Sequence, residues 1–337
     1  MAIGSEPRTT GKLAVPIGTD PVDPSRAPGT RIEGRSLRQV AWRRLRRDRG
    51  AMAGAVVVIL LILMAVFAPL IVDLLGHPPN EFHQDTIDPA TQLPEFRFPF
   101  GGFSAEYLMG VEPPFGRDIF SRIIYGSRIS LLIAFLATML SVVLGSTMGV
   151  IAGYFGGWVD TVISRAMDVF LAFPILVFAI ALAGVVPDRA FGLSGDTLRI
   201  VLLIFIIGFF NWGYIARIIR GQTLSLRERE FVDAARSLGA RGPYIIFKEI
   251  VPNLIAPIVI YSTLLIPTNI IFEAALSFLG VGIRPPTATW GGMLSEAVRY
   301  YTLPHFVFWP GLAIFITVLS FNLFGDGLRD ALDPKTR

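Results

Sequence analysis

Residues 51–72 read AMAGAVVVILLILMAVFAPLIV, an apolar run without a single charged side chain. A helix needs about 20 mainly apolar residues to cross the hydrocarbon core of a bilayer, so this run predicts a membrane-spanning helix. Five further segments have the same character: 129–159, 169–187, 200–216, 254–272 and 306–325. Together the six segments predict an all-α, polytopic membrane protein with six transmembrane helices.

Prolines inside these segments do not argue against helices, because neighbouring helices can satisfy the backbone groups that a proline frees. Pro174, Pro257 and Pro267 therefore do not exclude helices in these segments. The fifth segment extends through AALSFLG if Glu273 is tolerated in the span.

The composition of the whole chain agrees with a membrane protein. Of 337 residues, 53% are hydrophobic and 17% are charged, against about 25% charged in soluble domains. These values exclude a disordered chain and argue against a soluble globular domain. The chain has no cysteine, which excludes disulfides, thiolate metal sites and cysteine nucleophiles.

Arginines set the expected orientation. Eight of them lie within residues 31–49, and such a cluster next to the first span stays in the cytoplasm. Six crossings then place both termini in the cytoplasm. The loop 217–250 should be inside and holds seven cations, whereas the loop 77–127 should be outside and holds three.

Three regions follow from this pattern. Residues 1–35, rich in Pro, Gly, Ser and Thr, are predicted to be a disordered cytoplasmic tail. Residues 36–50 predict a basic helix lying on the inner membrane surface, although a merely solvated basic stretch remains the alternative. Residues 51–337 form the predicted transmembrane domain, with an outer loop at 77–127 and an inner loop at 217–250.

Sequence signals for catalysis or for a metal are absent. The single Gly-Lys pair, Gly11-Lys12, lacks the upstream glycine of a phosphate-binding loop. His77, His83 and His305 do not have metal-ligand spacing, and no G-x-S-x-G motif occurs. We therefore expect no enzymatic activity, no metal and no bound cofactor in this chain.

Two stretches point to packing and docking. Gly145, Gly149, Gly153 and Gly157 are spaced four apart and predict close helix packing, with a substrate path along that groove as the alternative. In the inner loop, apolar residues recur at helical spacing around a pair of alanines, and Gly239 is a natural stop for that short helix. Such a helix either lies on lipid or docks into a partner. Its acidic residues disfavour anionic lipid.

At this loop the chain resembles a known family. DAARSLG at 233–239 and EIVPN at 249–253 are similar to the EAA loop of ABC-importer permeases, with Asp233 in place of the usual Glu. Three further stretches resemble the peptide and nickel members of that group: GRDIFSRIIYGSRISL (116–131), EAALSFLGVGIRPPTATWGGML (273–294) and GDGLRDALDP (325–334). The resemblance covers roughly residues 36–337 and fits the C-type permease of a dipeptide or oligopeptide importer.

The resemblance implies a type I ABC-importer permease fold and a set of partners. These are a homologous second permease, two ATPase subunits that bind ATP and Mg, and an extracytoplasmic substrate-binding protein; no nucleic acid is implied. The location implied is the plasma membrane of a bacterial or archaeal cell. The helix that couples to an ATPase would consist of Glu230, Phe231, Asp233, Ala234, Ala235, Arg236, Leu238 and Gly239.

Two further sets of residues are candidates for contact with the substrate-binding protein and with the substrate. The outer loop carries aromatic residues at Phe96, Phe98, Phe100, Phe103 and Tyr107. They could contact the substrate-binding protein or form a self-packed cap. Polar residues of the spans that could line a peptide path are Asn211, Trp212, Thr268, Asn269, Ser320 and Asn322. Each of these could equally form a helix–helix hydrogen bond.

Other functions remain open at this stage. Related permeases carry peptides, nickel or other solutes, and the lack of histidine in the spans disfavours nickel. A stand-alone secondary transporter would be expected to carry ionisable residues on its path, and these spans are nearly free of them. A membrane enzyme would need convergent titratable groups in the spans.

Overall fold

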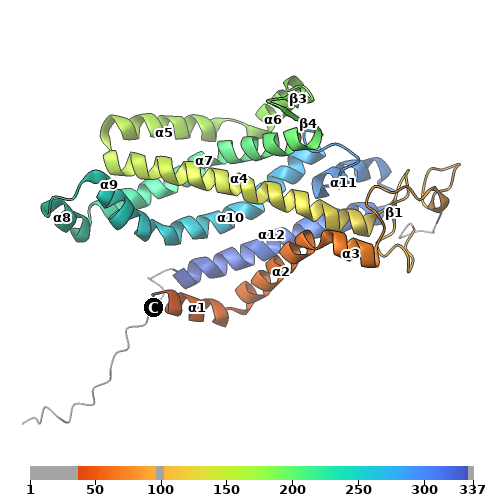
Figure 1. The fold of residues 1–337 in the computed structure, drawn as a ribbon, viewed down its shortest axis with the longest axis horizontal. Coiled ribbons are helices and arrows are strands. Elements are labelled where there is room, and N and C mark those ends of the chain that lie inside the picture. Colours follow the sequence, from red (N-terminus) through yellow and green to blue (C-terminus); the bar gives the residue numbers. More distant parts are fainter. Residues whose placement is uncertain (1–36, 96–101, 333–337) are drawn as a thin grey trace, which may run out of the picture.

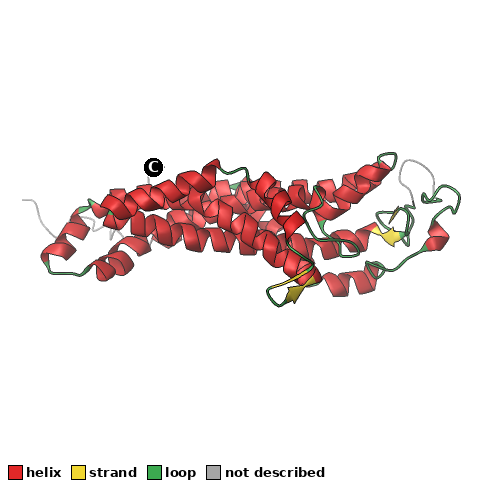
Figure 2. Ribbon diagram, turned by 90° about the horizontal axis from the view of Figure 1, so that it is seen from above, coloured by secondary structure: helices red, strands yellow, loops and turns green. Residues whose placement is uncertain are grey.

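Long helices lying side by side make up most of the molecule (Figures 1 and 2). The structure is a computed structural model that describes residues 37–95 and 102–332, so the predicted tail at 1–35 lies outside it. Within the described residues, five helical segments are long and apolar enough to cross a membrane, and a bent helix pair gives a sixth. The predicted all-α, polytopic fold class is therefore confirmed.

The first apolar run forms two helices instead of one. The amino-terminal elements are α1 (Leu37–Arg47), α2 (Arg49–Val66), α3 (Ala68–Leu75) and the 3-10 turn η1 (Gln84–Thr86). Asp48 starts α2, because its carboxylate accepts a hydrogen bond from the Ala51 backbone N–H at 3.0 Å. The chain breaks at Phe67 because Pro69, in the first turn of α3, cannot donate its own backbone hydrogen bond.

The third predicted span, 169–187, is broken at a proline. The central elements are β1 (Val111–Glu112), β2 (Arg117–Asp118), α4 (Ile119–Phe155), α5 (Gly157–Ala172) and α6 (Ile175–Val185). This segment is therefore a bent pair of helices and not one continuous helix. Phe173 is extended, as the residue before a proline prefers, and α5 and α6 meet there at an angle of 77°.

The carboxy-terminal half contains the remaining spans. Its elements are β3 (Arg189–Ala190), β4 (Leu193–Ser194), α7 (Gly195–Arg227), α8 (Glu230–Ser237), α9 (Gly242–Tyr244), the π-helical segment η2 (Ile245–Ile250), α10 (Val251–Phe278), α11 (Trp290–Ala297), the 3-10 turn η3 (Val298–Tyr300) and α12 (Pro304–Leu332). Pro257 and Pro267 lie inside α10, as predicted. Glu273 lies in the same helix, where it is fully buried and accepts a hydrogen bond from the Ser277 hydroxyl at 2.8 Å.

The glycine spacing on α4 permits its contact with α7, the most extensive helix pair in the molecule. A Cβ atom at Gly149 would lie 2.6 Å from the backbone oxygen of Ala216, and one at Gly145 would lie 2.7 Å from that of Trp212. Gly153 is equally close to α7, whereas Gly157 has no neighbour within 4 Å. The predicted packing role is therefore confirmed for three of the four glycines.

Three other contacts complete the bundle. α2 packs on α12, where Gly54 approaches the backbone of Ser320. α10 lies between α4 and α12. Leu45 of α1 is buried against Ala331 near the end of α12, so the first and last described helices meet at the same end of the molecule (Figure 1).

We predict that Gly149→Ala destabilises the protein by about 1–3 kcal/mol, because the added methyl group meets backbone atoms of α7 that cannot move aside. Thermal or SDS-induced unfolding of the purified protein in one detergent measures this effect. Gly221→Ala on α7 is the matched control, because nothing lies within 4 Å of its added Cβ. Equal stability of the two variants would contradict this account of the α4–α7 contact.

Candidate functional site

A short helix, α8, lies at one end of the bundle and follows α7 and precedes α9 in the chain (Figure 1). Gly239 adopts a φ of 82° just after it. The Gly239 N–H donates to the Arg236 oxygen at 2.9 Å, and the Ala240 N–H donates to the Ala235 oxygen at 3.0 Å. This pair of bonds is the Schellman arrangement that closes a helix with a left-handed glycine. The predicted stop at Gly239 is confirmed.

The apolar side chains of α8 divide between two faces. Val232 is fully buried, and Ala235 is half-buried in the same cluster of η2 and the inner end of α10. Ala234 is exposed, Phe231 is 39% exposed and Leu238 is 89% exposed. The two alanines therefore do not share one flat face: one holds the helix on the bundle, and the other belongs to a small apolar surface that this chain leaves uncovered.

The charges on α8 lie at the surface. Glu230 and Asp233 occupy its first turn and Arg236 its last, which complements the helix dipole. Arg236 pairs with Asp233 at 3.2 Å, with both side chains exposed, and such a pair contributes little to stability. These charges therefore remain accessible beside the uncovered apolar surface.

Ion pairs that the sequence analysis did not single out attach α7 to α5 beside α8. Arg220 donates two hydrogen bonds to the Asp160 carboxylate, one of them at 2.6 Å. Arg217 reaches Asp168 at 2.6 Å, and Arg227 donates to the backbone oxygen of Tyr154 at the end of α4. In the sequence these arginines are recognisable only as positive charges of the loop predicted to lie inside. The acidic partners of Arg217 and Arg220 come from a different helix, so no local pattern reveals these two pairs.

Two of the polar candidates in the spans form one buried network. Asn211 of α7 donates its amide N–H to the Asn269 side-chain oxygen at 2.9 Å. Asn269 of α10 donates in turn to the Thr138 hydroxyl of α4 at 2.8 Å. Three neighbouring helices are thereby joined by side chains, which is the helix–helix alternative given for these residues.

The remaining polar candidates are scattered. Trp212 is buried against Met167 and Ala152, and the Ser320 hydroxyl donates to the Ile316 oxygen of its own helix at 2.7 Å. Thr268 and Asn322 are exposed. The structure therefore does not bring the six candidates together into one site.

Of the outer-loop aromatics, Phe96, Phe98 and Phe100 lie outside the described residues. Phe103 is 50% exposed, whereas Tyr107 is buried with its ring stacked on His77 at 4.7 Å between centroids. Burial and neighbouring carboxylates raise the pKa of Tyr107 to about 12. The two described members therefore differ: one faces outward and the other belongs to a packed cap.

A cluster of four charges, three of them buried, joins elements at the end of the molecule opposite α8, and no sequence motif marks it. Glu112 on β1 is fully buried and contacts both Arg117 and Arg122, the latter at 2.8 Å. Both arginines also approach Glu296 of α11, at 3.4 and 3.5 Å. Burial raises the pKa of Glu112, and the two guanidinium groups oppose that shift. The cluster joins the β1–β2 hairpin, α4 and α11.

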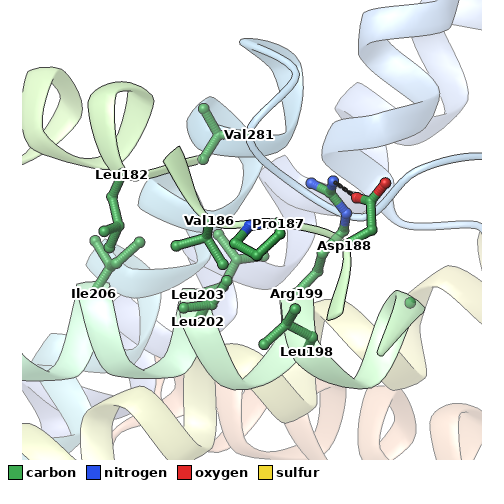
Figure 3. A pocket seen from close by; sticks show the side chains of 11 residues that line it. Leu182, Val186, Pro187, Asp188, Leu198, Arg199, Leu202, Leu203, Ile206 and Val281 are labelled. Atoms are coloured by element: carbon green, nitrogen blue, oxygen red, sulfur yellow. Dashed lines mark hydrogen bonds and ion pairs between the residues drawn. The ribbon is translucent and has the colours of Figure 1, made fainter. Parts of the chain in front are cut away.

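A second outer contact closes the β3–β4 hairpin onto α7 (Figure 3). Arg199 of α7 pairs with Asp188 at 3.2 Å, and Arg284 reaches the same carboxylate oxygen at 3.2 Å. Leu182, Leu203 and Ile206 line the small pocket below. The pocket is a packing gap between α6 and α7, with its only charges at the rim.

Sequence comparisons place the chain among known proteins. A family described as the binding-protein-dependent transport system inner membrane component matches residues 145–337. The chain belongs to this family. The N-terminal transmembrane domain of oligopeptide transport permease C matches residues 36–94. The resemblance seen in the motifs is thereby confirmed, and the protein is a permease of the ABC-importer type.

Relatives of the permease cover nearly its whole length. The dipeptide transport system permease protein DppC of Alkalihalophilus pseudofirmus is 39% identical over 88% of this chain and 90% of its own. The glutathione transport system permease protein GsiD of Escherichia coli is 41% identical over the same shares. The structure of the inward-facing MetNI methionine ABC transporter aligns with a TM-score of 0.53 and 18% identity, over 64% of the permease and 98% of that chain. This likeness confirms the predicted fold.

We predict that Glu112→Gln lowers the stability of the permease by about 3–5 kcal/mol, since it leaves two buried guanidinium groups with a single shared partner. The free energy of unfolding in detergent measures the loss. Glu81→Gln, at an exposed position of the same loop, should change it by less than about 0.5 kcal/mol. A similar small effect of both variants would show that the cluster does not hold the outer end.

Proposed function

We propose that this permease is the C-type membrane subunit of an ATP-driven importer of dipeptides or oligopeptides, forming half of the translocation path. The match at residues 36–94 to oligopeptide permease C supports this assignment. The relatives DppC and GsiD, named for dipeptide and glutathione transport, support it as well. The proposal rests chiefly on the small apolar surface of α8, which is formed by Phe231, Ala234 and Leu238 and lies uncovered at one end of the bundle.

In this proposal α8 is the coupling helix that sits in a groove of one ATPase subunit. Phe231 and Leu238 would insert into the ATPase, while Glu230, Asp233 and Arg236 set the register of docking. Val232 transmits the motion because it is packed against η2 and α10. When the ATPases bind ATP and Mg and close, α8 moves and the bundle switches between inward and outward access. ATP hydrolysis belongs to the partner subunits.

The proposed orientation places α1, α8 and the carboxy-terminal end of α12 in the cytoplasm of a bacterial or archaeal cell. The arginines of α1, such as Arg43 and Arg47, favour that side. The burial of Leu45 against Ala331 supports a common side for both ends of the described chain. The β1–β2 and β3–β4 hairpins then face outward, where a substrate-binding protein delivers its cargo, with Phe103 as a candidate contact.

The path for substrate is proposed to run beside a second, homologous permease. Thr268 and Asn322 are exposed in this chain and are the better candidates for its lining. Asn211 and Asn269 are committed to each other and to α4, so their proposed contribution is to hold α7 and α10 in register.

We predict that Phe231→Glu weakens binding of the ATPase by about 2 kcal/mol or more, close to thirtyfold, because it places a charge at the centre of the docking surface. Co-purification of ATPase with the tagged permease, and ATP-dependent uptake, measure the loss. Leu238→Glu should act in the same way.

Phe191→Glu is the matched control for this prediction, since Phe191 is 88% exposed in the β3–β4 hairpin at the other end of the molecule. Its variant should retain the ATPase at the wild-type level. Retention of ATPase by both glutamate variants, with unchanged folding, would refute docking through α8.

For the substrate, we predict uptake of dipeptides and no uptake of nickel in cells that express the complete importer and lack other peptide permeases. In the described part of the chain, no group of three or more His, Asp or Glu residues could hold a metal ion. His305, the one histidine near a span, is buried against Val111. Labelled dipeptide and nickel-63 accumulation distinguish the two cargoes. Nickel accumulation without peptide would favour the metal importer, and peptide uptake without the ATPases would favour a stand-alone carrier.

A further inference from the structure

A large groove, distinct from the α8 surface and the polar network, opens between α2, α4, α10 and α12. Its volume is about 920 Å³, at the upper end of the range for ligand sites. Apolar side chains such as Ile62, Leu132 and Phe135 make up its walls, and all three are exposed in this chain. Its few polar groups gather at one end, where the outer loops cover α4.

The charged group of the groove is Arg128. It lies on the exposed surface of α4, and its guanidinium carbon is 5.8 Å from the centre of the Tyr125 ring. None of the ion pairs within residues 37–95 and 102–332 includes Arg128. The nearby Arg117 and Arg122 are both committed to Glu112 and Glu296. A cation inside an apolar helix is a functional candidate in its own right.

Helix geometry gives the depth of the groove in the membrane. At 1.5 Å per residue, Ile62 lies about 20 Å and Val66 about 26 Å along α2 from Arg49. The hydrocarbon core is about 30 Å thick, so with Arg49 at one surface these residues line the opposite leaflet. Phe135 lies about 10 Å deeper along α4 than Arg128. The groove therefore runs through much of one leaflet, with its cation and Tyr125 at the headgroup level.

We infer that this groove binds a phospholipid of the outer leaflet, with its phosphate on Arg128 and an acyl chain along Ile62, Leu132 and Phe135. The charge matches, because a guanidinium forms paired hydrogen bonds with phosphate oxygens. The shape matches as well, because a flexible hydrocarbon chain fills an irregular apolar groove. The tyrosine belongs at the interface between headgroups and hydrocarbon.

Two other occupants fit the groove less well. A peptide needs hydrogen-bonding partners along its backbone, and the walls below Arg128 are apolar. A helix of a second permease packs closely where small residues line the contact, whereas large branched and aromatic side chains line this one. The inference requires only that the chain spans a membrane, and it is independent of the peptide assignment; the orientation decides which leaflet supplies the lipid.

Site-specific photo-crosslinking in membranes tests the inference on the permease co-expressed with its partner subunits. p-Benzoylphenylalanine in place of Ile62 reports on the groove, and the same probe in place of Leu60, which is 58% exposed on α2 outside the groove, reports on bulk lipid. Mass spectrometry of the adduct identifies phospholipid, peptide or a second permease chain.

We expect a phospholipid adduct at position 62 that falls about tenfold in Arg128→Gln, as the loss of one charge-assisted contact predicts. Arg128→Lys, which keeps the charge, should retain most of the adduct, and the adduct at position 60 should not change in either variant. Val66→Trp, which fills the groove and leaves Arg128 in place, should also remove the adduct at position 62.

Three outcomes overturn the inference. A peptide or permease adduct at position 62 identifies a different occupant. A lipid adduct at position 62 that neither Arg128→Gln nor Val66→Trp reduces is bulk lipid. If the lipid adducts at positions 60 and 62 decrease equally in a variant, the substitution has changed the protein as a whole and not the groove. If separate assays show that the wild-type permease does not bind an ATPase or does not import peptide, the proposed function is refuted. The lipid result does not depend on those assays and still stands.

Discussion

The close approach of α4 and α7 is the contact on which the rest of the structure depends. Gly145, Gly149 and Gly153 bring the two backbones together so tightly that a single methyl group would meet main-chain atoms. In a bilayer, association of helices relies on such packing, because lipid tails are as apolar as the side chains. The β1–β2 hairpin directly precedes the amino-terminal end of α4, and the carboxy-terminal end of α7 leads directly into α8. The contact therefore connects the two ends of the molecule.

Polar groups are concentrated where they fasten one helix to another. The Asn211–Asn269–Thr138 chain joins three spans, the Arg220–Asp160 pair holds α5 to α7, and Glu112 gathers two arginines at the outer end. A polar side chain without a partner is costly in an apolar environment, so each of these contacts restricts the helices to a few arrangements. A bundle with few arrangements can switch between two of them when a partner pulls on one element.

Two other features of the molecule differ from these paired polar side chains. Within the described residues, the apolar surface of α8 is uncovered at one end of the bundle, and Arg128 has no acidic partner at the end of an apolar groove. We propose a protein partner for the first and a lipid for the second, because their surroundings differ. α8 lies at one end of the bundle with exposed charges beside it, whereas the groove lies between helices that are long and apolar enough to cross a membrane.

Much of this protein could be read from the chain alone. Hydrophobic length determined the spans, the arginine distribution indicated an orientation, and Gly239 marked the end of α8, because these depend on transfer to lipid or on local backbone preference. The EAA-like motif likewise identified the family from the sequence alone.

The effect of each proline could not be predicted from the sequence. Pro257 and Pro267 lie inside a helix, whereas Pro174 breaks one, because the outcome depends on whether neighbouring helices satisfy the freed backbone groups. Only the tertiary structure decided that Ala234 is exposed while Ala235 packs on the bundle, that Glu112 contacts two arginines, and that Arg128 has no ion pair within the described residues. Each of these facts depends on which other elements pack around the residue, and the local sequence does not specify that packing.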